Sequence, residues 1–542
     1  MVEHSGIYDY RDISPPRLSA IFLVVAGFIR RGGSDRLLRS GAPNEPGGRR
    51  RSRGQYPTMK KSSISNGMSA GADHHMLKND PNFHRNRMKK PVKVAYIMSR
   101  FPELTETFVL YEMLSVEQMG IEVEVFPLLR GSTSAKTRDG ASLFRKLLDL
   151  RSSGREAQLV QPEARRLVQR ACYQPFLSLS ILGAQIHFLR HKPKEYLSAL
   201  WNLIRGTWGS LNFMLGGVSI FPKVVLFARV MESKGIHHVH AHFANHPAAA
   251  AFVIHRLTGI SYSFTAHGSD LHRRKQMLRQ KVAEAAFVVP ISGYNKRVIE
   301  EVCGRDCSSR VEVIRCGVDR NVFFPCPNGG SMSNGAFNVL SIGKLHPVKG
   351  HIYLIDACKL LRERRMDFVC LIVGDGPDRA LLQEKIAAAG LADFVHLLGP
   401  RLRTEIAEIY RGAHVLVAPS VPTSTGRREG IPVVLMEAMA SGLPVVASRI
   451  SGIPELVEHG ENGILVPPAD PRSLAGALQR LQDEPGLRVR LGNAGRMKIA
   501  AEYDLARNAA LLAKRFSECA GFSGSGMQGR LPVHLNRFPR KE

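Results

Sequence analysis

The chain has 542 residues, 44% of them hydrophobic and 23% charged, which suffices for two or three domain cores at roughly 100 to 200 residues each. Its formal net charge of +28 favours a polyanionic partner: nucleic acid, a phosphorylated substrate or an anionic membrane surface. The basic residues are dispersed, and the sequence has no aromatic-rich basic motif that would stack single-stranded bases. We therefore expect no nucleic-acid partner.

The eight cysteines indicate free thiols in a cytoplasmic protein. Cys358 and Cys370 lie within apolar runs, where small buried thiols are common. A looser cluster between Cys303 and Cys326 contains no C-x2-C pair, so unpaired thiols are favoured over a zinc site.

Residues 1–87 form a basic segment with 15 Lys and Arg against 7 Asp and Glu. Its apolar run, 20–29, has ten residues, whereas a membrane-spanning helix needs about 20. A signal peptide is an alternative, but acidic residues precede the run and no small-x-small cleavage site follows. The rest of the segment has the composition of disordered chain. We expect a disordered, dispensable extension, with a genuine arm as the alternative.

From residue 88 onward, short apolar runs alternate with helical patterns, which predicts an α/β protein with two doubly wound, Rossmann-like domains. The predicted strands are 93–98, 123–127, 236–240, 261–265 and 286–290, then 337–342, 368–373, 395–398, 414–418, 444–447 and 463–466. The predicted boundaries are 88–325 for the first domain, 326–505 for the second, 506–520 for a helix crossing back to the first, and 521–542 for a disordered tail.

The first domain contains a long helical pattern over 143–231 that interrupts the strands. Large apolar side chains such as Trp201 and Trp208 alternate there with Arg190, Lys192 and Arg205. This composition indicates a helical insert that packs on the sheet or lies against an anionic bilayer surface. Packing on the sheet is the favoured interpretation.

The clearest chemical motif is Arg428-Glu-Gly-Ile-Pro-Val-Val-Leu-Met-Glu437, in which two carboxylates lie eight positions apart. Glu429 stands in a turn and Glu437 about two turns into a helix, so both can face one site. The helix start exposes unpaired N–H groups that suit a diphosphate. We expect this helix start at about Ile431 to Val434.

A second motif, Gly343-Lys-Leu-His-Pro-Val-Lys349, leaves an apolar strand and offers two ammonium groups, on Lys344 and Lys349. Fixed cations can neutralise the charge that develops on a diphosphate leaving group. Two Gly residues, Gly374 and Gly376, follow the next predicted strand, where small residues allow the backbone to approach a nucleotide.

These motifs, in this order, resemble those of retaining family 4 glycosyltransferases with the GT-B fold, in particular transferases of colanic acid and exopolysaccharide biosynthesis. The resemblance covers about 88–517, and includes Gly442-Leu-Pro-Val-Val and Gly460-Glu-Asn-Gly463. It implies that the second domain binds the nucleotide sugar and the first domain the acceptor. The implied donor-site residues are Gly343, Lys344, Lys349, Gly374, Gly376, Ser420, Glu429, Gly430, Ile431, Pro432, Val433 and Glu437.

Within that family, Glu429 would hold the transferred sugar, Glu437 the ribose, and Lys344 and Lys349 the diphosphate. The family usually has Arg where this chain has Lys344, which removes the bidentate fork. The implied catalytic set is Lys344, Lys349, Glu429 and His267, which follows a first-domain strand and would contact the sugar. A lone histidine after a strand is otherwise structural.

The acceptor-binding candidates are Arg100, Thr105, Glu106, Thr107 and Asp270. Four of them form a glycine-free loop after the first strand, which favours side-chain contacts to an acceptor. An N-cap at Thr105 or Thr107 is compatible with this interpretation. The histidines between 237 and 246 have the composition of a zinc site, but the resemblance argues for a structural or acceptor-side role and no metal.

The sequence thus predicts a metal-independent, retaining transferase that moves a hexose-type sugar from a UDP- or GDP-sugar, with no cofactor. The predicted acceptor is a glycan or lipid-diphosphate-linked oligosaccharide of a growing surface polysaccharide. The predicted location is the cytoplasm, peripheral on the anionic inner face of the cytoplasmic membrane. One alternative is a non-catalytic GT-B scaffold of a polysaccharide assembly. Another is a GT-B enzyme acting on sugar phosphates or as an epimerase, which would not require the two spaced carboxylates.

Overall fold

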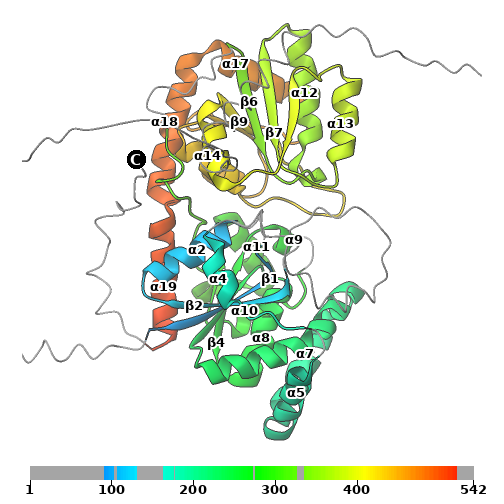
Figure 1. The fold of residues 1–542 in the computed structure, drawn as a ribbon, viewed down its shortest axis with the longest axis vertical. Helices are drawn as coiled ribbons and strands as arrows, with labels where there is room; N and C mark the ends of the chain where they lie inside the picture. Colours follow the sequence, from blue (N-terminus) through cyan, green and yellow to red (C-terminus); the bar gives the residue numbers. More distant parts are fainter. Residues whose placement is uncertain are drawn as a thin grey trace, which may run out of the picture. The chain divides into compact units, whose positions relative to one another are not determined.

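The computed structural model describes residues 91–102, 107–130, 163–175, 178–272, 275–325 and 335–521. From Pro91 onward the chain forms one compact unit that contains two parallel β-sheets (Figure 1). The predicted disordered segments 1–87 and 521–542 lie outside the described residues, apart from Gly521.

The first sheet has five parallel strands in the order β2-β1-β3-β4-β5. Its elements in chain order are β1 (Lys93–Phe101), α2 (Thr107–Gln118), β2 (Glu122–Arg130), α4 (Ala164–Arg170), α5 (Leu179–His191), α6 (Pro193–Thr207), α7 (Leu211–Lys234), β3 (His238–His242), α8 (His246–Thr258), β4 (Ser261–Ala266), α9 (Ser269–His272), α10 (Leu278–Glu284), β5 (Phe287–Pro290), α11 (Gly293–Cys303) and the 3-10 helix η2 (Arg305–Arg310).

The second sheet has six parallel strands in the order β11-β10-β9-β6-β7-β8. Its elements are β6 (Phe337–Ile342), the 3-10 helix η3 (Pro347–Lys349), α12 (His351–Glu363), β7 (Phe368–Val373), α13 (Arg379–Ala388), β8 (Val395–Gly399), α14 (Arg403–Gly412), β9 (Val415–Ala418), α15 (Val433–Ala440), β10 (Val445–Ser448), α16 (Ile453–Leu456), β11 (Ile464–Val466), α17 (Pro471–Asp483), α18 (Pro485–Glu502) and α19 (Leu505–Cys519).

All eleven predicted strands are confirmed, because each apolar run is buried on both faces by helices, as parallel sheets require. The largest differences are at the ends of β1 and β2, which each extend three residues beyond the predicted end, while β3 begins at His238 instead of 236. Both sheets are doubly wound, so each has a switch point where the strand order reverses: between β1 and β3, and between β6 and β9. Ligands of such sheets bind at the carboxyl ends of the strands at that point.

The final helix, α19, lies against the first sheet instead of the second. Asp504 caps it by accepting from the Arg507 N–H, and Val318 pairs with Asp504 at its start. Its apolar face, including Leu512 and Phe516, joins the core formed by α2, β1 and β5. The chain therefore returns to its first half after completing the second sheet.

The helical pattern predicted over 143–231 is present as α4 to α7, while 143–162 lie outside the described residues. The longest of these helices, α7, ends at Gly235 in the left-handed conformation (φ 63°), a common helix stop. Phe221, Val225 and Phe227 bury its second half against the sheet. The favoured interpretation, packing on the sheet, is correct for these side chains.

Candidate active site

The loops at the switch point of the second sheet contain most of the predicted donor-site residues. Gly343 follows β6, and the buried Ser420 follows β9, its neighbour in the sheet. A Cβ on Gly374 would lie 1.9 Å from the Gly343 carbonyl oxygen, and one on Gly376 would lie 2.3 Å from that of Leu345. These glycines allow two loops of the protein to touch, a requirement separate from the predicted approach to a nucleotide.

The two predicted cations differ in their surroundings. Lys349 ends η3, and its Nζ lies 2.8 Å from Oε2 of Glu429 in a partly buried ion pair. Its aliphatic stem crosses Gly343, where an added Cβ would lie 3.2 Å from Cε. Lys344 is exposed. The structure therefore brings Lys349 and Glu429 together and leaves Lys344 on the surface of the same loop.

Glu437 lies one turn into α15, which begins at Val433, two residues later than Ile431, the first residue of the predicted helix start. Its side chain is buried, and its Oε2 accepts a hydrogen bond from the Tyr410 hydroxyl over 3.0 Å. Burial raises the pKa of Glu437, while the Tyr410 hydrogen bond and the charge of Arg403 oppose that rise. No sequence motif indicated Tyr410, because it lies on an ordinary amphipathic helix, α14.

The predicted sugar-site residues of the two halves meet at a contact between glycines. A Cβ on Gly430 would lie 2.1 Å from the His267 carbonyl oxygen, and one on Gly268 (φ 131°) would lie 2.8 Å from Cα of Gly430. Any side chain at either position would separate the two loops. Because glycine has no side chain, the His267 backbone can lie directly against Gly430, the residue that follows Glu429.

A second contact holds the same two halves together. The carboxylate of Glu455, on α16, accepts from the N–H groups of Gly293 and Tyr294, over 2.8 and 2.5 Å. These N–H groups open α11, where unpaired donors and the positive end of the helix dipole favour a carboxylate.

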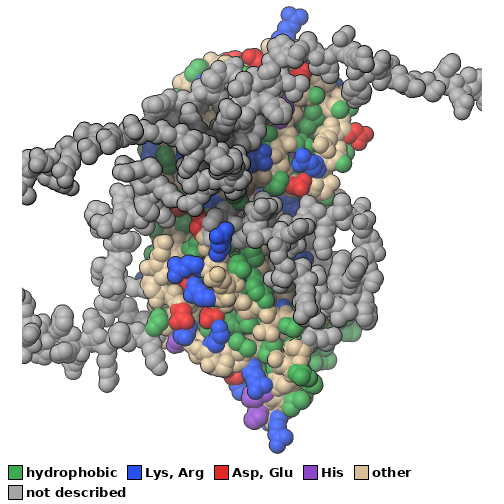
Figure 2. All heavy atoms as spheres, in the orientation of Figure 1, with side chains coloured by type: hydrophobic (Ala, Val, Ile, Leu, Met, Phe, Trp, Pro, Cys, Tyr) green, Lys and Arg blue, Asp and Glu red, His purple; other side chains and the backbone are tan. Residues whose placement is uncertain are grey.

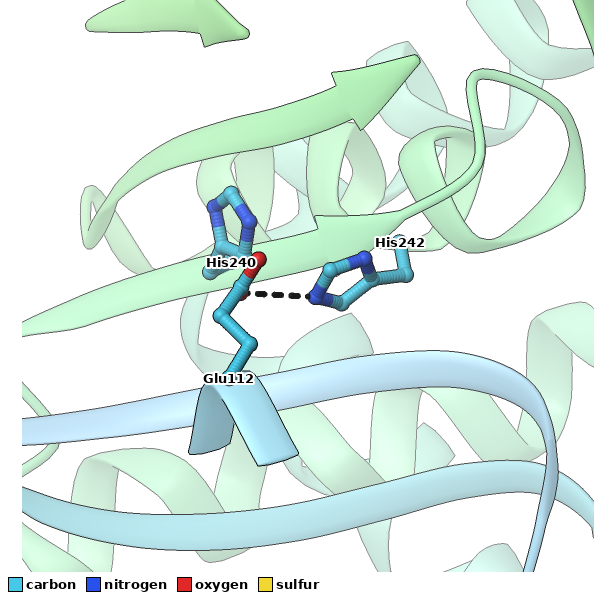
Figure 3. Close-up of side chains that lie close together, drawn as sticks. All are labelled: Glu112, His240 and His242. Atoms are coloured by element: carbon cyan, nitrogen blue, oxygen red, sulfur yellow. Dashed lines mark hydrogen bonds and ion pairs between the residues drawn. The ribbon is translucent and has the colours of Figure 1, made fainter. Parts of the chain in front are cut away.

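His267 belongs to a chain of buried polar side chains. Its Nε2 lies 3.0 Å from Nδ1 of His242, whose Nε2 lies 3.1 Å from Oε1 of Glu112. The Tyr96 hydroxyl donates to the same carboxylate oxygen over 3.3 Å. Figure 3 shows Glu112 of α2 directed at the two histidines of β3, with the bond to His242 marked. Glu112 was not among the predicted site residues, since no motif surrounds it in the sequence.

This chain of bonds fixes the tautomers. Burial, assisted by His242, lowers the pKa of His267 well below its ordinary value, so the ring is neutral. For a neutral His242 ring that donates Nε2–H to Glu112, Nδ1 of His242 accepts from Nε2–H of His267. Nδ1 of His267 is left as an acceptor, 4.0 Å from the Cys316 sulfur.

His238 and His240 of β3 form hydrogen bonds with side chains of the neighbouring strand β4. His238 contacts the hydroxyls of Ser261 and Ser263 through its two ring nitrogens, and His240 contacts those of Ser263 and Thr265, all over 2.7 to 2.9 Å. The ligand atoms of Glu112, His240 and His242 lie within 4.8 Å of one another, a grouping compatible with a cation. Every nitrogen of the two rings already has a hydrogen-bond partner, which favours the predicted structural role.

The acceptor-binding candidates do not form one cluster in the described residues. Arg100 is exposed at the end of β1, and Thr107 opens α2, whereas Thr105 and Glu106 lie outside the described residues. Asp270 is buried, and its carboxylate accepts from the N–H groups of Ala244, His267 and Gly268 over 2.6 to 3.1 Å. Asp270 thus holds the turn that carries His267, and its acceptor role stays a prediction.

Two family models match the chain, one in each half. Glycosyltransferase Family 4 matches residues 179–322, and Glycosyl transferases group 1 matches 336–484. The amylovoran biosynthesis glycosyltransferase AmsK of Erwinia amylovora is 29% identical over 425 residues, which is 76% of this chain and 96% of AmsK. WcaL of Escherichia coli K12, named for colanic acid biosynthesis, is 29% identical over 71% of this chain and 90% of its own length.

Among solved structures, Anabaena Alr3699/HepE in complex with UDP-glucose aligns with a TM-score of 0.57 and 18% identity, covering 79% of this chain and 99% of HepE. Sucrose-phosphate synthase from Thermosynechococcus elongatus aligns with a TM-score of 0.56 and 19% identity, over 80% of this chain and all of that one. This likeness establishes the fold, two Rossmann-like domains of the GT-B type. The family models and relatives identify the chain as a glycosyltransferase, with a Glycosyltransferase Family 4 domain over residues 179–322 and a group 1 domain over 336–484.

Proposed function

We propose that this chain transfers a hexose-type sugar from a UDP- or GDP-sugar to a growing, lipid-linked exopolysaccharide, with retention of configuration and without a metal ion. The observation that carries this proposal is the contact between the His267 turn and the Glu429–Gly430 loop, beside the Lys349–Glu429 ion pair. It brings an acidic group, a cation and a neutral histidine from two domains to one place, as group transfer from a diphosphate requires.

In the proposed reaction, Glu429 accepts hydrogen bonds from the sugar, and Lys349 neutralises the charge that develops on the leaving diphosphate. The N–H groups at the start of α15 bind the same diphosphate, and Glu437 holds the ribose. Lys344, exposed on the same loop as Lys349, adds a second cation when the donor binds. A leaving diphosphate oxygen accepts the proton of the acceptor hydroxyl on the face from which it departs.

The acceptor proposal rests on the relatives. AmsK and WcaL are named for the biosynthesis of amylovoran and colanic acid. We propose an acceptor of the same class, a glycan or a lipid-diphosphate-linked oligosaccharide, presented at the cytoplasmic face of the cell membrane. The net charge of +28 supports placement against an anionic membrane surface.

The test has two stages, both in the presence of a chelator and with the full chain. The first measures the melting temperature of the protein against a panel of UDP- and GDP-sugars, since a ligand of the folded state raises it by mass action. UDP-glucose is the first member, because HepE was solved with it. Glu437→Gln should abolish the shift, whereas Glu408→Gln, an exposed carboxylate on α14, should retain it.

The second stage supplies the selected donor and a lipid-diphosphate oligosaccharide, and determines the anomeric configuration of the product by NMR. Retention without added metal supports the proposal. Inversion, or turnover only after metal is restored, would refute the mechanism. Donor binding without any transfer across acceptors would favour the non-catalytic scaffold.

A further inference from the structure

Exposed hydrophobic side chains are concentrated on three consecutive helices of the first domain. Of the fifteen large hydrophobic side chains exposed in the described part of the chain, ten lie between residues 179 and 218. They are Leu179, Leu182, Ile186, Leu189, Leu197, Trp201, Trp208, Leu211, Leu215 and Val218. In Figure 2 hydrophobic side chains gather over the region that Figure 1 labels α5 and α7. Protein surfaces rarely leave such a concentration without an occupant.

These side chains form a second apolar stripe on helices whose other face already packs inward. On α5, Ile181, Ala184 and Phe188 are buried, while Leu182, Ile186 and Leu189 are exposed. Both stripes recur at three- and four-residue spacing, so each occupies one side of the helix. The core therefore accounts for one stripe and leaves the other unpartnered among the described residues.

The same arrangement recurs on α6 and α7. On α6, Ala199 and Leu203 face the core and Leu197 and Trp201 are exposed. On α7, Phe213 and Gly217 are buried, while Leu211, Leu215 and Val218 lie outside. We call these ten exposed side chains, nine on the three helices and Trp208 in the turn between α6 and α7, the apolar face.

The charges near the apolar face are mostly positive. Between residues 179 and 218 the chain has Arg190, Lys192, Lys194 and Arg205 against one carboxylate, Glu195. Arg190 and Lys194 are exposed at the junction of α5 and α6, and Arg205 is exposed near the end of α6. A cationic rim beside leucine and tryptophan is the pattern of helices that lie in the headgroup region of anionic bilayers.

One helix of this group, α7, is long and apolar enough to cross a membrane by length and composition alone. Half of its most apolar stretch is buried inside the protein, where Phe221, Val225 and Phe227 belong to the core of the first sheet. A crossing would expose the sheet and strip those contacts. Contact along the membrane surface requires no such change, because the exposed large hydrophobic side chains of α7 are confined to its first third.

We infer that the apolar face of α5, α6 and α7 is a docking surface for an anionic phospholipid bilayer, with the helices lying along the membrane plane. The inference rests on the proposed function in one respect, the presentation of the acceptor at a membrane. It adds the surface, the residues and the orientation. Docking through the first domain brings the acceptor-binding half of the protein to the bilayer.

The chain provides its own probe, because its two tryptophans, Trp201 and Trp208, both lie on the apolar face, 62% and 76% exposed. In buffer their emission should be that of exposed indole and should be quenched by iodide. Vesicles of phosphatidylcholine and phosphatidylglycerol should shift the emission to the blue, and brominated lipids should quench it. Vesicles of phosphatidylcholine alone should give a weaker response that added salt leaves unchanged.

Two sets of variants keep both tryptophans as reporters. Leu182→Ser with Leu215→Ser should lower the partition coefficient by about tenfold or more, because buried methylene groups drive interfacial binding. Lys194→Glu with Arg205→Glu should lower it by about fivefold per charge on anionic vesicles only. The matched control is Val489→Ser with Met497→Ser, equally exposed side chains on α18, which should leave partitioning unchanged.

Three results would overturn the inference. The first is emission and quenching that vesicles do not alter. The second is tryptophan emission that changes with protein concentration in the absence of lipid, together with a dimer detected by light scattering. That result would assign the apolar face to a second copy of the chain. The third is a pair of tryptophans already shielded from iodide in buffer, which would mean that the face is covered.

The same preparations separate this inference from the proposed function. Donor binding is measured by melting temperature without vesicles, and docking by tryptophan emission without nucleotide sugar. If the protein binds the donor but does not dock on vesicles, only the membrane-docking inference is refuted. Docking without donor binding leaves the surface in place and counts against the transferase.

Discussion

The two halves of the molecule share a doubly wound parallel sheet but build their sites differently. In the second half, the predicted donor residues follow consecutive strands and meet at the switch point between β6 and β9. In the first half, His267 depends on Glu112 and His242, which come from a helix and another strand and form no sequence motif. A site that loops assemble at one edge of a sheet can be predicted from sequence motifs, whereas a buried chain of hydrogen bonds cannot.

The largest effect on the reaction rate should come from removing the charge of Lys349 in the second half. Lys349→Ala should lower kcat by about 10² to 10³, since electrostatic groups at a developing anion contribute on that scale. Lys349→Arg should recover part of the rate, because the charge is kept. Steady-state kinetics with the selected donor provides the measurement, and an unchanged kcat would remove Lys349 from the catalytic set.

The histidines of the first half should make its stability sensitive to pH. Burial lowers the pKa of His238 to about 3, so the unfolded chain binds a proton below about pH 6.5 that the folded chain does not. The stability that neutral His238 provides is therefore full above pH 6.5 and declines as the pH falls toward 3. At pH 5 the loss for one such histidine is about 2 kcal/mol.

His238→Gln should flatten the fall of melting temperature between pH 6.5 and 5 relative to the parent. Val489→Ser, an exposed substitution on α18 that changes no titratable group, serves as the comparison and should leave the slope unchanged. Parallel curves for parent and His238→Gln would contradict the assignment of a neutral buried ring.

The contact between the halves can be tested with a single methyl group. Gly430→Ala would place Cβ about 2.1 Å from the His267 carbonyl oxygen, so one of the loops must move. We expect a loss of about 1 to 3 kcal/mol in stability and a rise in KM for the donor. Gly476→Ala, on α17 with open space around its Cβ, should be neutral or stabilising. If both variants behave alike, the glycine contact has no special role.

The hydrogen-bond chain should have a smaller effect on rate. Glu112→Gln keeps the shape of the side chain but removes the carboxylate that orients His242, so we expect kcat to fall by about tenfold, the scale of one hydrogen bond to a charged group. Because Glu112 acts through the charge of its carboxylate, Glu112→Asp, which keeps that charge, should recover part of the rate. An equal loss of rate in both variants would indicate a purely structural role.

The smallest effect should follow Lys344→Arg, which introduces the residue that the family usually has at this position. Because Lys344 is exposed, we expect kcat/KM to rise by no more than about threefold, the scale of an exposed charge interaction. A tenfold rise would mean that the donor closes this loop over its diphosphate far more tightly than the uncomplexed geometry indicates.

The sequence by itself determined the eleven strands, the two-domain plan and the donor motifs. These features are local: short apolar runs, turn glycines and charged residues just after strands do not depend on distant partners. It also placed Glu429 and His267 in one site, but only through resemblance.

Only the tertiary structure decided the rest. The pairing of Lys349 with Glu429, the Gly268–Gly430 contact and the Glu112–His242–His267 chain join positions far apart in the chain, and no local pattern encodes their distances. The apolar face is similar, since α5 to α7 are apolar on two sides and sequence periodicity cannot distinguish the side that the core covers. Packing selects one stripe for burial, and the other is left exposed.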